Sequence, residues 1–211
     1  QLLWECLAGI ERHYPHAPVH VVSDVPADCS FTWVKDCHGV GSRRFKTRLA
    51  ELSPFETTVV LDDDTVIHHP FGRADEWLGG CDIAMAPDFT FPTLGVYRKR
   101  AGGGAPAAAA KQGITAANAT KPFFSSGVIV FQKSSIVSDL FDAWNTEWMV
   151  HQQMDQQPLV SAIAKTGAEV NSLPHTMNFV TNHHGRGLSY QEMPGYNLHF
   201  WRNKVASVTE Y

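Results

Sequence analysis

Residues 57–65 read TTVVLDDDT, an apolar stretch followed at once by three carboxylates. The residues from Thr57 to Leu61 are β-branched or aliphatic and follow a Ser-Pro pair, which predicts a buried strand. Three adjacent negative charges repel one another unless solvent or a cation compensates them. Because ligands bind at the carboxyl ends of strands in open α/β sheets, the stretch predicts a ligand site. A solvated acidic turn is the alternative interpretation.

The three aspartates indicate a hard cation as the ligand. Asp62 and Asp64 point the same way on an extended chain, so both can coordinate one ion. Carboxylates suit Mg²⁺ or Mn²⁺, and a distant imidazole, His199, tilts the choice toward Mn²⁺. Lys204 lies five residues beyond His199. A cation beside an ammonium group suits a diphosphate, whose departure they ease by compensating its charge.

Composition bounds the class of protein. The chain has 211 residues, 44% of them hydrophobic, so we expect one domain over residues 1–211. The net charge of −4 provides no basic field for nucleic acid. No apolar run approaches the roughly 18 residues of a membrane span, and no signal peptide is visible. A cytoplasmic location is therefore favoured, with the Golgi or secretory lumen open if a signal or anchor was trimmed.

Alternating strand-like and helix-like segments predict an α/β fold with a largely parallel sheet. We expect helices at 2–13, 43–52, 136–148 and after Asp155, with one helical turn at most from Ser53. We expect strands at 19–22, 57–61, 82–86 and 127–131, and a late strand or turn at 197–201. Residues 101–120 are rich in Gly and Ala and form either a surface loop or a substrate lid. The four cysteines form no CxxC pair, and we expect reduced thiols.

Four segments in this order resemble the GT-A fold glycosyltransferases, especially family 8 and its glycogenin-like relatives. FKTRL at 45–49 leads through SPFE at 53–56 to LDDDT at 61–65, similar to the family's basic helix, turn and DxD strand. FSSGVIVF at 124–131 resembles its N-[ST]-G-V strand, and Asp155-Gln156 resembles its DQ pair. His199-Phe200 with Lys204 resembles its C-terminal metal histidine and phosphate lysine.

The resemblance implies a Rossmann-like GT-A fold, with a mixed, mostly parallel sheet flanked by helices. It implies a metal-dependent enzyme that moves a sugar from a nucleoside-diphosphate sugar, expected to be a UDP-sugar, to an acceptor. A carbohydrate, lipid-linked or protein acceptor is expected. Transfer with retention of anomeric configuration is expected, and Mn²⁺ or Mg²⁺ is the implied cofactor. Oligomeric state and donor sugar are not indicated.

The resemblance also assigns roles to individual residues. Asp62, Asp64 and His199 are implied to hold the metal, with Asp62 also near the ribose. Lys204 is implied to contact the diphosphate, and either Lys46 or Arg48 the donor sugar or phosphate. The remaining donor contacts are Asp63, Asp88, Ser125 and Ser126. Asp155 and Gln156 are implied to lie near the anomeric carbon and the acceptor.

Several residues have structural alternatives. Lys46 and Arg48 are also compatible with a solvated helix face, and Asp155 with a helix cap. Asp88 could stabilise a turn, and His199 could be a core histidine. The pairs His68-His69 and His183-His184 suggest a second metal site, but adjacent strand residues point to opposite faces.

The chain departs from the family at three places. The family's first strand, which carries nucleotide contacts, has no counterpart before residue 2, so either the chain was cut or the nucleotide pocket is a variant. Ser125 stands where the family has Asn, and the spacing from His199 to Lys204 is one residue short. Two other functions remain open: a haloacid-dehalogenase-like phosphatase, which shares the strand and Asp-x-Asp pattern, and a non-catalytic sugar-nucleotide-binding module.

Overall fold

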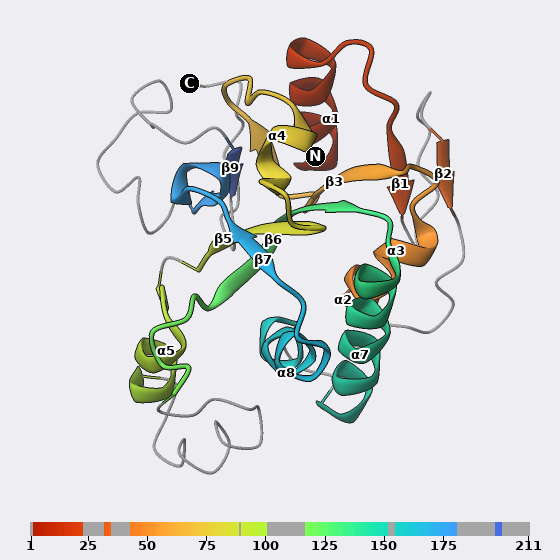
Figure 1. Ribbon diagram of the computed structural model, residues 1–211. Coiled ribbons are helices and arrows are strands. Elements are labelled where there is room, and N and C mark those ends of the chain that lie inside the picture. The colour runs from red at the N-terminus through yellow and green to blue at the C-terminus, as the bar shows by residue number, and fades with distance from the viewer. Residues whose placement is uncertain are drawn as a thin grey trace.

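The protein is a layered α/β structure with helices on both faces of a central sheet (Figure 1). The computed structural model describes residues 2–22, 32–34, 43–88, 90–100, 117–151, 155–180 and 197–199. Lys204, His183-His184 and residues 101–116 of the Gly/Ala-rich segment lie outside these ranges. The expectations for them therefore stay predictions.

The central sheet has the strand order β3-β6-β5-β7. Its strands are β3 (Thr57–Leu61), β6 (Phe124–Gln132), β5 (Ile83–Pro87) and β7 (Val170–Ser172). β6 is antiparallel to both neighbours, and β7 is parallel to β5. β3, β5 and β7 thus run in one direction with β6 reversed between them, which confirms the expected mixed, mostly parallel sheet.

Two smaller sheets complete the described strands. β1 (His20–Val22) pairs in parallel with β2 (Thr32–Val34), apart from the central sheet. β9 (Asn197–His199) lies between β4 (Thr65–Ile67) and β8 (Phe179–Val180). The antiparallel register of β4 and β9 sets Thr65 opposite His199. The backbone of His199 is therefore next to the residue that follows the three aspartates.

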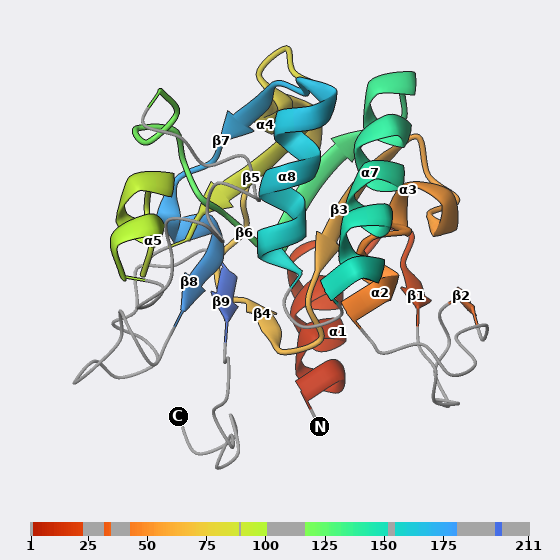
Figure 2. The same cartoon turned by 90° about the horizontal axis from the view of Figure 1, so that it is seen from below.

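Two helical layers cover the central sheet. α7 (Ser135–His151) and α8 (Gln156–Thr166) pack on one face, where Figure 2 shows them side by side in front of the sheet. α1 (Leu2–His13) and α4 (Ala74–Leu78) lie on the other face (Figure 1). α5 (Leu94–Arg100) and the 3₁₀ helix η1 (His175–Asn178) flank the sheet. None of the helices in the described ranges is long and apolar enough to cross a membrane.

The core is built around β6, whose first eight residues are all buried. Alternate side chains of this strand face the two layers, since Ile129 packs with α7 and α8 and Val130 with α4. Trp144 and Trp148 are 1% and 6% exposed, so both tryptophans belong to the core. β3 differs from the expectation of a buried strand: Thr57 is exposed and the other four residues are only partly buried.

The expected helix at 43–52 is broken into α2 (Arg43–Lys46) and α3 (Leu49–Leu52). The buried Thr47 hydroxyl donates to the Arg44 carbonyl oxygen at 2.7 Å, a local bond that competes with the helical pattern. No helical turn forms from Ser53, within the expected limit of one turn at most. Its hydroxyl oxygen instead accepts the Phe55 N–H at 3.2 Å and holds a non-helical turn before β3.

Candidate functional site

A partly buried polar network gathers four of the predicted site residues at one edge of the central sheet. The Lys46 Nζ atom lies 2.7 Å from Asp62 Oδ2 and 3.4 Å from Asp155 Oδ2. The Ser126 hydroxyl donates to the same oxygen of Asp155. These groups come from α2, the end of β3, the start of β6 and the residue before α8. One ammonium therefore joins two carboxylates that are far apart in sequence.

The charges of this network are mutually stabilised. Burial raises the pKa of Asp155, but the Lys46 charge and the Ser126 hydrogen bond outweigh it, so the pKa lies below its ordinary value. Burial lowers the pKa of Lys46, but the attraction of Asp62 and Asp155 leaves it above its ordinary value. Lys46 is thus a cation and Asp155 an anion at neutral pH.

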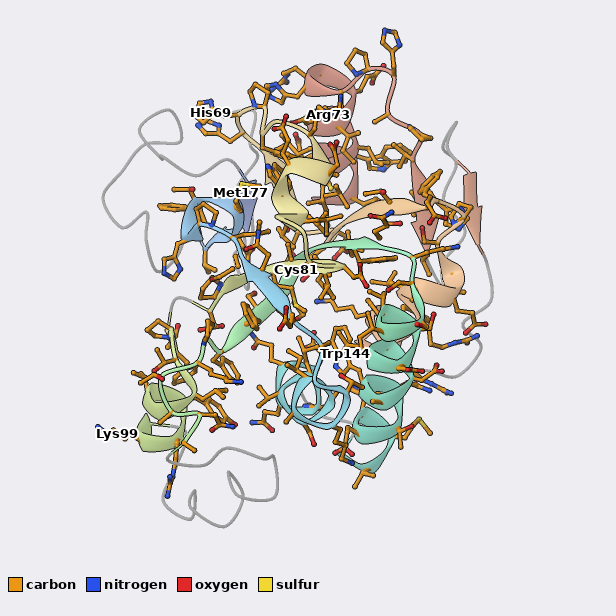
Figure 3. The ribbon with its side chains drawn as sticks, in the orientation of Figure 1. His69, Arg73, Cys81, Lys99, Trp144 and Met177 are labelled. Carbon is orange, nitrogen blue, oxygen red and sulfur yellow. The ribbon has the colours of Figure 1, made fainter. Side chains whose placement is uncertain are left out.

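Asp155 holds its place through its backbone rather than by capping α8. Its side chain makes no capping hydrogen bond to the helix, so the helix-cap alternative is wrong. Its carbonyl oxygen accepts the indole N–H of Trp144 at 2.7 Å. Figure 3 shows Trp144 between α7 and α8. The side chain of Asp155 is consequently available to Lys46 and Ser126.

Gln156 and Asp88 extend the network along the sheet edge. The Gln156 Nε2 atom donates to Asp88 Oδ2 at 2.9 Å and to the Phe124 carbonyl oxygen at 3.4 Å. The other Asp88 oxygen accepts the Phe91 N–H at 2.9 Å, as the turn alternative for this residue anticipates. Asp88 therefore stabilises a turn and also orients the Gln156 amide.

The three aspartates form a turn between β3 and β4. The Thr65 N–H donates to the Asp62 carbonyl oxygen at 3.0 Å, so the chain is not extended here and that premise of the sequence argument is corrected. Asp63 is exposed, whereas Asp64 is partly buried. The aspartates also affect the Cys6 thiol on α1. Burial, together with the negative charges of all three aspartates, raises the pKa of this thiol to about 12.

Ser125 has a partner that the sequence analysis missed. Asn178, 4% exposed at the end of η1, donates its Nδ2–H to Ser125 Oγ at 2.7 Å. Ser125 and Ser126 are adjacent but reach different partners, Asn178 and Asp155. The sequence signal for Asn178 is weak, since it is one amide between the apolar residues Met177 and Phe179.

The structure separates the two basic candidates. Lys46 enters the network, whereas Arg48 forms a bidentate ion pair with Glu51, whose side chain is 66% exposed. Cys6 and Cys81 are free thiols. The rings of His68 and His69 lie 4.0 Å apart beyond the end of β4, contrary to the expectation of opposite faces.

A divalent metal can be tested against the residues that surround the acidic turn. Two carboxylates and one imidazole form a donor set typical of Mn²⁺ or Mg²⁺. Asp62 and Asp64 flank the turn, and the strand pairing brings the His199 backbone opposite Thr65. Within the described ranges, no three His, Cys, Asp or Glu side chains are already grouped to hold a metal. The donor chemistry fits, and the Lys46 ammonium meanwhile compensates Asp62.

Comparison with solved structures identifies the fold. LgtC, a galactosyltransferase solved with donor and acceptor sugar analogues, superposes with a TM-score of 0.59 at 14% identity, over 95% of this chain and 82% of that chain. Mouse xyloside xylosyltransferase 1 gives 0.53 at 14% identity, over 94% and 90%. WbbM, a bifunctional glycosyltransferase, gives 0.57 at 16% identity, over 82% of this chain and 35% of that chain.

In comparisons of sequence, no family model and no curated protein matches the chain. The structural likeness nevertheless extends over nearly the whole chain in two of the three structures, and all three are glycosyltransferases. The chain therefore has the GT-A glycosyltransferase fold and resembles family 8.

Proposed function

We propose that this protein is a glycosyltransferase that moves a sugar from a nucleoside-diphosphate sugar, a UDP-sugar, to a carbohydrate, lipid-linked or protein acceptor. The observation that supports this most is the Lys46 network. Within a GT-A fold, residues from four separate elements meet at one sheet edge, and all were singled out from sequence by motif. The fold likeness favours this function over the phosphatase alternative.

Lys46 is suited to a ligand that brings its own negative charge. Its ammonium lies between Asp62 and Asp155, and the Lys46 side chain is still 22% exposed. A diphosphate or a sugar hydroxyl can reach the exposed part of the lysine, while the two carboxylates hold its ammonium group in place. We therefore assign the donor contact to Lys46 and not to Arg48, which pairs with Glu51.

Asp155 and Gln156 are suited to stabilise positive charge at the anomeric carbon. Asp155 stays ionised beside Lys46 and Ser126, so it is an electrostatic and positioning group rather than a proton donor. The Gln156 amide nitrogen is engaged by Asp88, which leaves the carbonyl oxygen to face an electron-poor carbon. LgtC has an active-site mutant in which a glutamine is replaced by glutamate, so a glutamine lies in the active site of that protein.

Metal binding falls to Asp62, Asp64 and His199, with Lys204 as the diphosphate lysine. When bound, Mn²⁺ or Mg²⁺ supplies positive charge that compensates the leaving diphosphate. Asp62 keeps a second partner in Lys46, so its carboxylate can be shared between the cation and the ammonium. Asp63, exposed on the turn, is left for the nucleotide side.

The reaction needs no dedicated carboxylate base. In a retaining transfer, the bond from the anomeric carbon to the diphosphate oxygen breaks and a bond from the acceptor oxygen forms on the same face. The acceptor proton passes to the departing phosphate oxygen. Asp155, already held by Lys46 and Ser126, takes no proton in this scheme. Water exclusion and orientation then rest on the buried residues around Ser125 and Ser126.

The test is calorimetric titration of UDP with and without Mn²⁺, in the wild type, Asp64→Ala and the control Asp75→Ala. Asp75 is an exposed carboxylate paired with Arg73 on α4. We expect Mn²⁺-dependent binding in the wild type and Asp75→Ala and its loss in Asp64→Ala. Unchanged binding in Asp64→Ala would overturn the metal assignment.

Turnover separates the enzyme from a sugar-nucleotide-binding module. UDP-glucose and UDP-galactose, incubated with the protein and Mn²⁺, should release UDP slowly by hydrolysis and faster with an acceptor. A protein that binds UDP with Mn²⁺ but releases none from any UDP-sugar would be a binding module.

A further inference from the structure

Asn178 is a buried residue whose side-chain amide contacts the hydroxyl group of Ser125. It is 4% exposed and lies between Met177 and Phe179, both buried. A buried amide without hydrogen bonds is costly, so its bond to Ser125 Oγ at 2.7 Å matters. The segment that carries it leads directly into β8, which pairs with β9. The hydrogen bond from Asn178 to Ser125 therefore links the β4-β9-β8 sheet, which contains His199, to the start of β6.

Ser125 receives two donors on one oxygen. The Nδ2–H of Asn178 and the N–H of Gly127, at 3.4 Å, both point to its Oγ. A serine hydroxyl has two lone pairs and one proton. Both lone pairs of Ser125 Oγ therefore accept hydrogen bonds. Only the hydroxyl proton is still available for a further hydrogen bond. In the described part of the chain, no acceptor takes that proton.

The Ser125 hydroxyl, with its available proton, lies at the proposed donor-sugar site. Ser125 is preceded by Phe124, whose carbonyl oxygen binds Gln156, and followed by Ser126, which binds Asp155. Gly127 accepts the Asp62 N–H through its carbonyl oxygen at 3.1 Å. The neighbours of Ser125 on β6 thus contact three of the site residues, two through backbone carbonyl oxygens and one through the Ser126 hydroxyl.

We propose that Asn178 is a positioning residue that turns the Ser125 proton toward the donor sugar. Ser125 then acts as a hydrogen-bond donor and selects a sugar that presents an acceptor oxygen at that place. The inference rests on the proposed function, because it takes the ligand of this edge to be a sugar nucleotide. It also explains how a serine serves where the resembling family has Asn, since the amide is supplied from residue 178.

The proposal predicts that Asn178 acts through Ser125 and on the sugar alone. Affinities for UDP, UDP-glucose and UDP-galactose, each with Mn²⁺, are measured by calorimetry in four proteins: wild type, Ser125→Ala, Asn178→Ala and the double variant. We expect either single variant to weaken the better-bound UDP-sugar about tenfold, the effect of one neutral hydrogen bond, and to leave UDP unchanged. The double variant should be no weaker than Ser125→Ala.

The outcomes separate failure of the inference from failure of the proposed function. Equal weakening of UDP and UDP-sugar by Asn178→Ala, or additive losses in the double variant, would show a merely structural role and overturn the inference. Absence of any UDP binding in the wild type would overturn the proposed function and the inference with it. If Asn178→Ala does not fold, Asn178→Asp keeps the shape but can only accept from Ser125, and wild-type affinity for the sugar in that variant would refute the proton direction.

Discussion

The indole N–H of Trp144 donates to the backbone carbonyl oxygen of Asp155, with Nε1 and O 2.7 Å apart. Trp144, labelled in Figure 3, is in the middle of α7. Asp155 is the residue before α8. The carbonyl oxygen also accepts the Leu159 N–H at 3.3 Å. A core tryptophan therefore fixes the backbone from which the Asp155 carboxylate reaches Lys46 and Ser126.

Trp144→Phe should impair both stability and transfer. It removes the hydrogen bond and part of the packing, and we expect the bond alone to account for about 1 kcal/mol of unfolding free energy. Trp148→Phe is the matched control, because Trp148 is also buried on α7 and its Nε1 has no hydrogen-bond partner among the described residues. Urea unfolding and UDP release from UDP-sugars check both. Equal effects of the two variants would contradict a positioning role for Trp144.

Lys46→Met and Arg48→Met should differ sharply. Lys46→Met leaves Asp62 and Asp155 without their shared cation, and we expect a loss of about 1–3 kcal/mol, less than for a fully buried pair because the lysine is partly exposed. Arg48 and Glu51 form a surface pair, so Arg48→Met should change stability by about 0.5 kcal/mol or less. Thermal unfolding and Mn²⁺-dependent UDP binding measure the contrast, and a larger effect at Arg48 would return the donor contact to that residue.

The Asp155 carboxylate should contribute to the free energy of unfolding at neutral and mildly acidic pH, and this contribution should disappear in strong acid. Because its pKa is lowered in the folded protein, Asp155 stabilises the fold above its unfolded pKa of about 3.9, and this contribution is lost as pH falls through the folded value. The stability difference between wild type and Asp155→Asn should thus be constant from pH 7 to 5 and shrink below about pH 4. Urea titrations at each pH measure it, with Asp139→Asn on the exposed face of α7 as the control. A difference at pH 3 as large as the difference at pH 7 would contradict the ion-pair account.

The strands were predictable where apolar runs are unbroken. Residues 57–61 form β3 with the expected bounds, because β-branched residues are bounded by a Ser-Pro pair and the aspartates. β6 begins three residues before the expected start, because Phe124 still pairs with Pro87. The break of the helix at Thr47 could not be predicted, since its hydroxyl also binds Asn145, 98 residues away.

The site was predictable as a set of residues but not as a set of contacts. Motifs indicated both Lys46 and Arg48, but Lys46 ends α2 and Arg48 directly precedes α3, so the break between these helices gives the two side chains different partners. Asn178 is 53 residues from Ser125 in sequence, and no local pattern joins them. Chain-distant partners of this kind come from the fold alone.

The thiol of Cys6 should be inert in the native protein. Burial and the nearby aspartates raise its pKa to about 12, and the reactive thiolate is therefore scarce at pH 8. Cys81 is more exposed and should react with iodoacetamide faster. Peptide mapping by mass spectrometry after brief labelling compares the two, and labelling in urea provides the reference for full reactivity. Labelling of Cys6 at the rate of Cys81 in the native protein would contradict its placement beneath the acidic turn.

Gly9→Ala should force α1 away from β4. A Cβ atom at Gly9 would lie 3.1 Å from the backbone nitrogen of Ile67 and 3.2 Å from its carbonyl oxygen, and neither backbone atom can easily move. We expect a net loss of about 1–2 kcal/mol, even though alanine favours the helix by up to about 1 kcal/mol. Ala8→Gly, at the exposed neighbouring position, measures that propensity on the same helix.

Because β4 leads directly out of the aspartate turn, the shift of α1 should also weaken Mn²⁺-dependent UDP binding in Gly9→Ala and not in Ala8→Gly. Urea unfolding midpoints and calorimetry measure the two effects. A more stable Gly9→Ala protein with unchanged binding would show that the close approach of α1 to Ile67 does not constrain the turn.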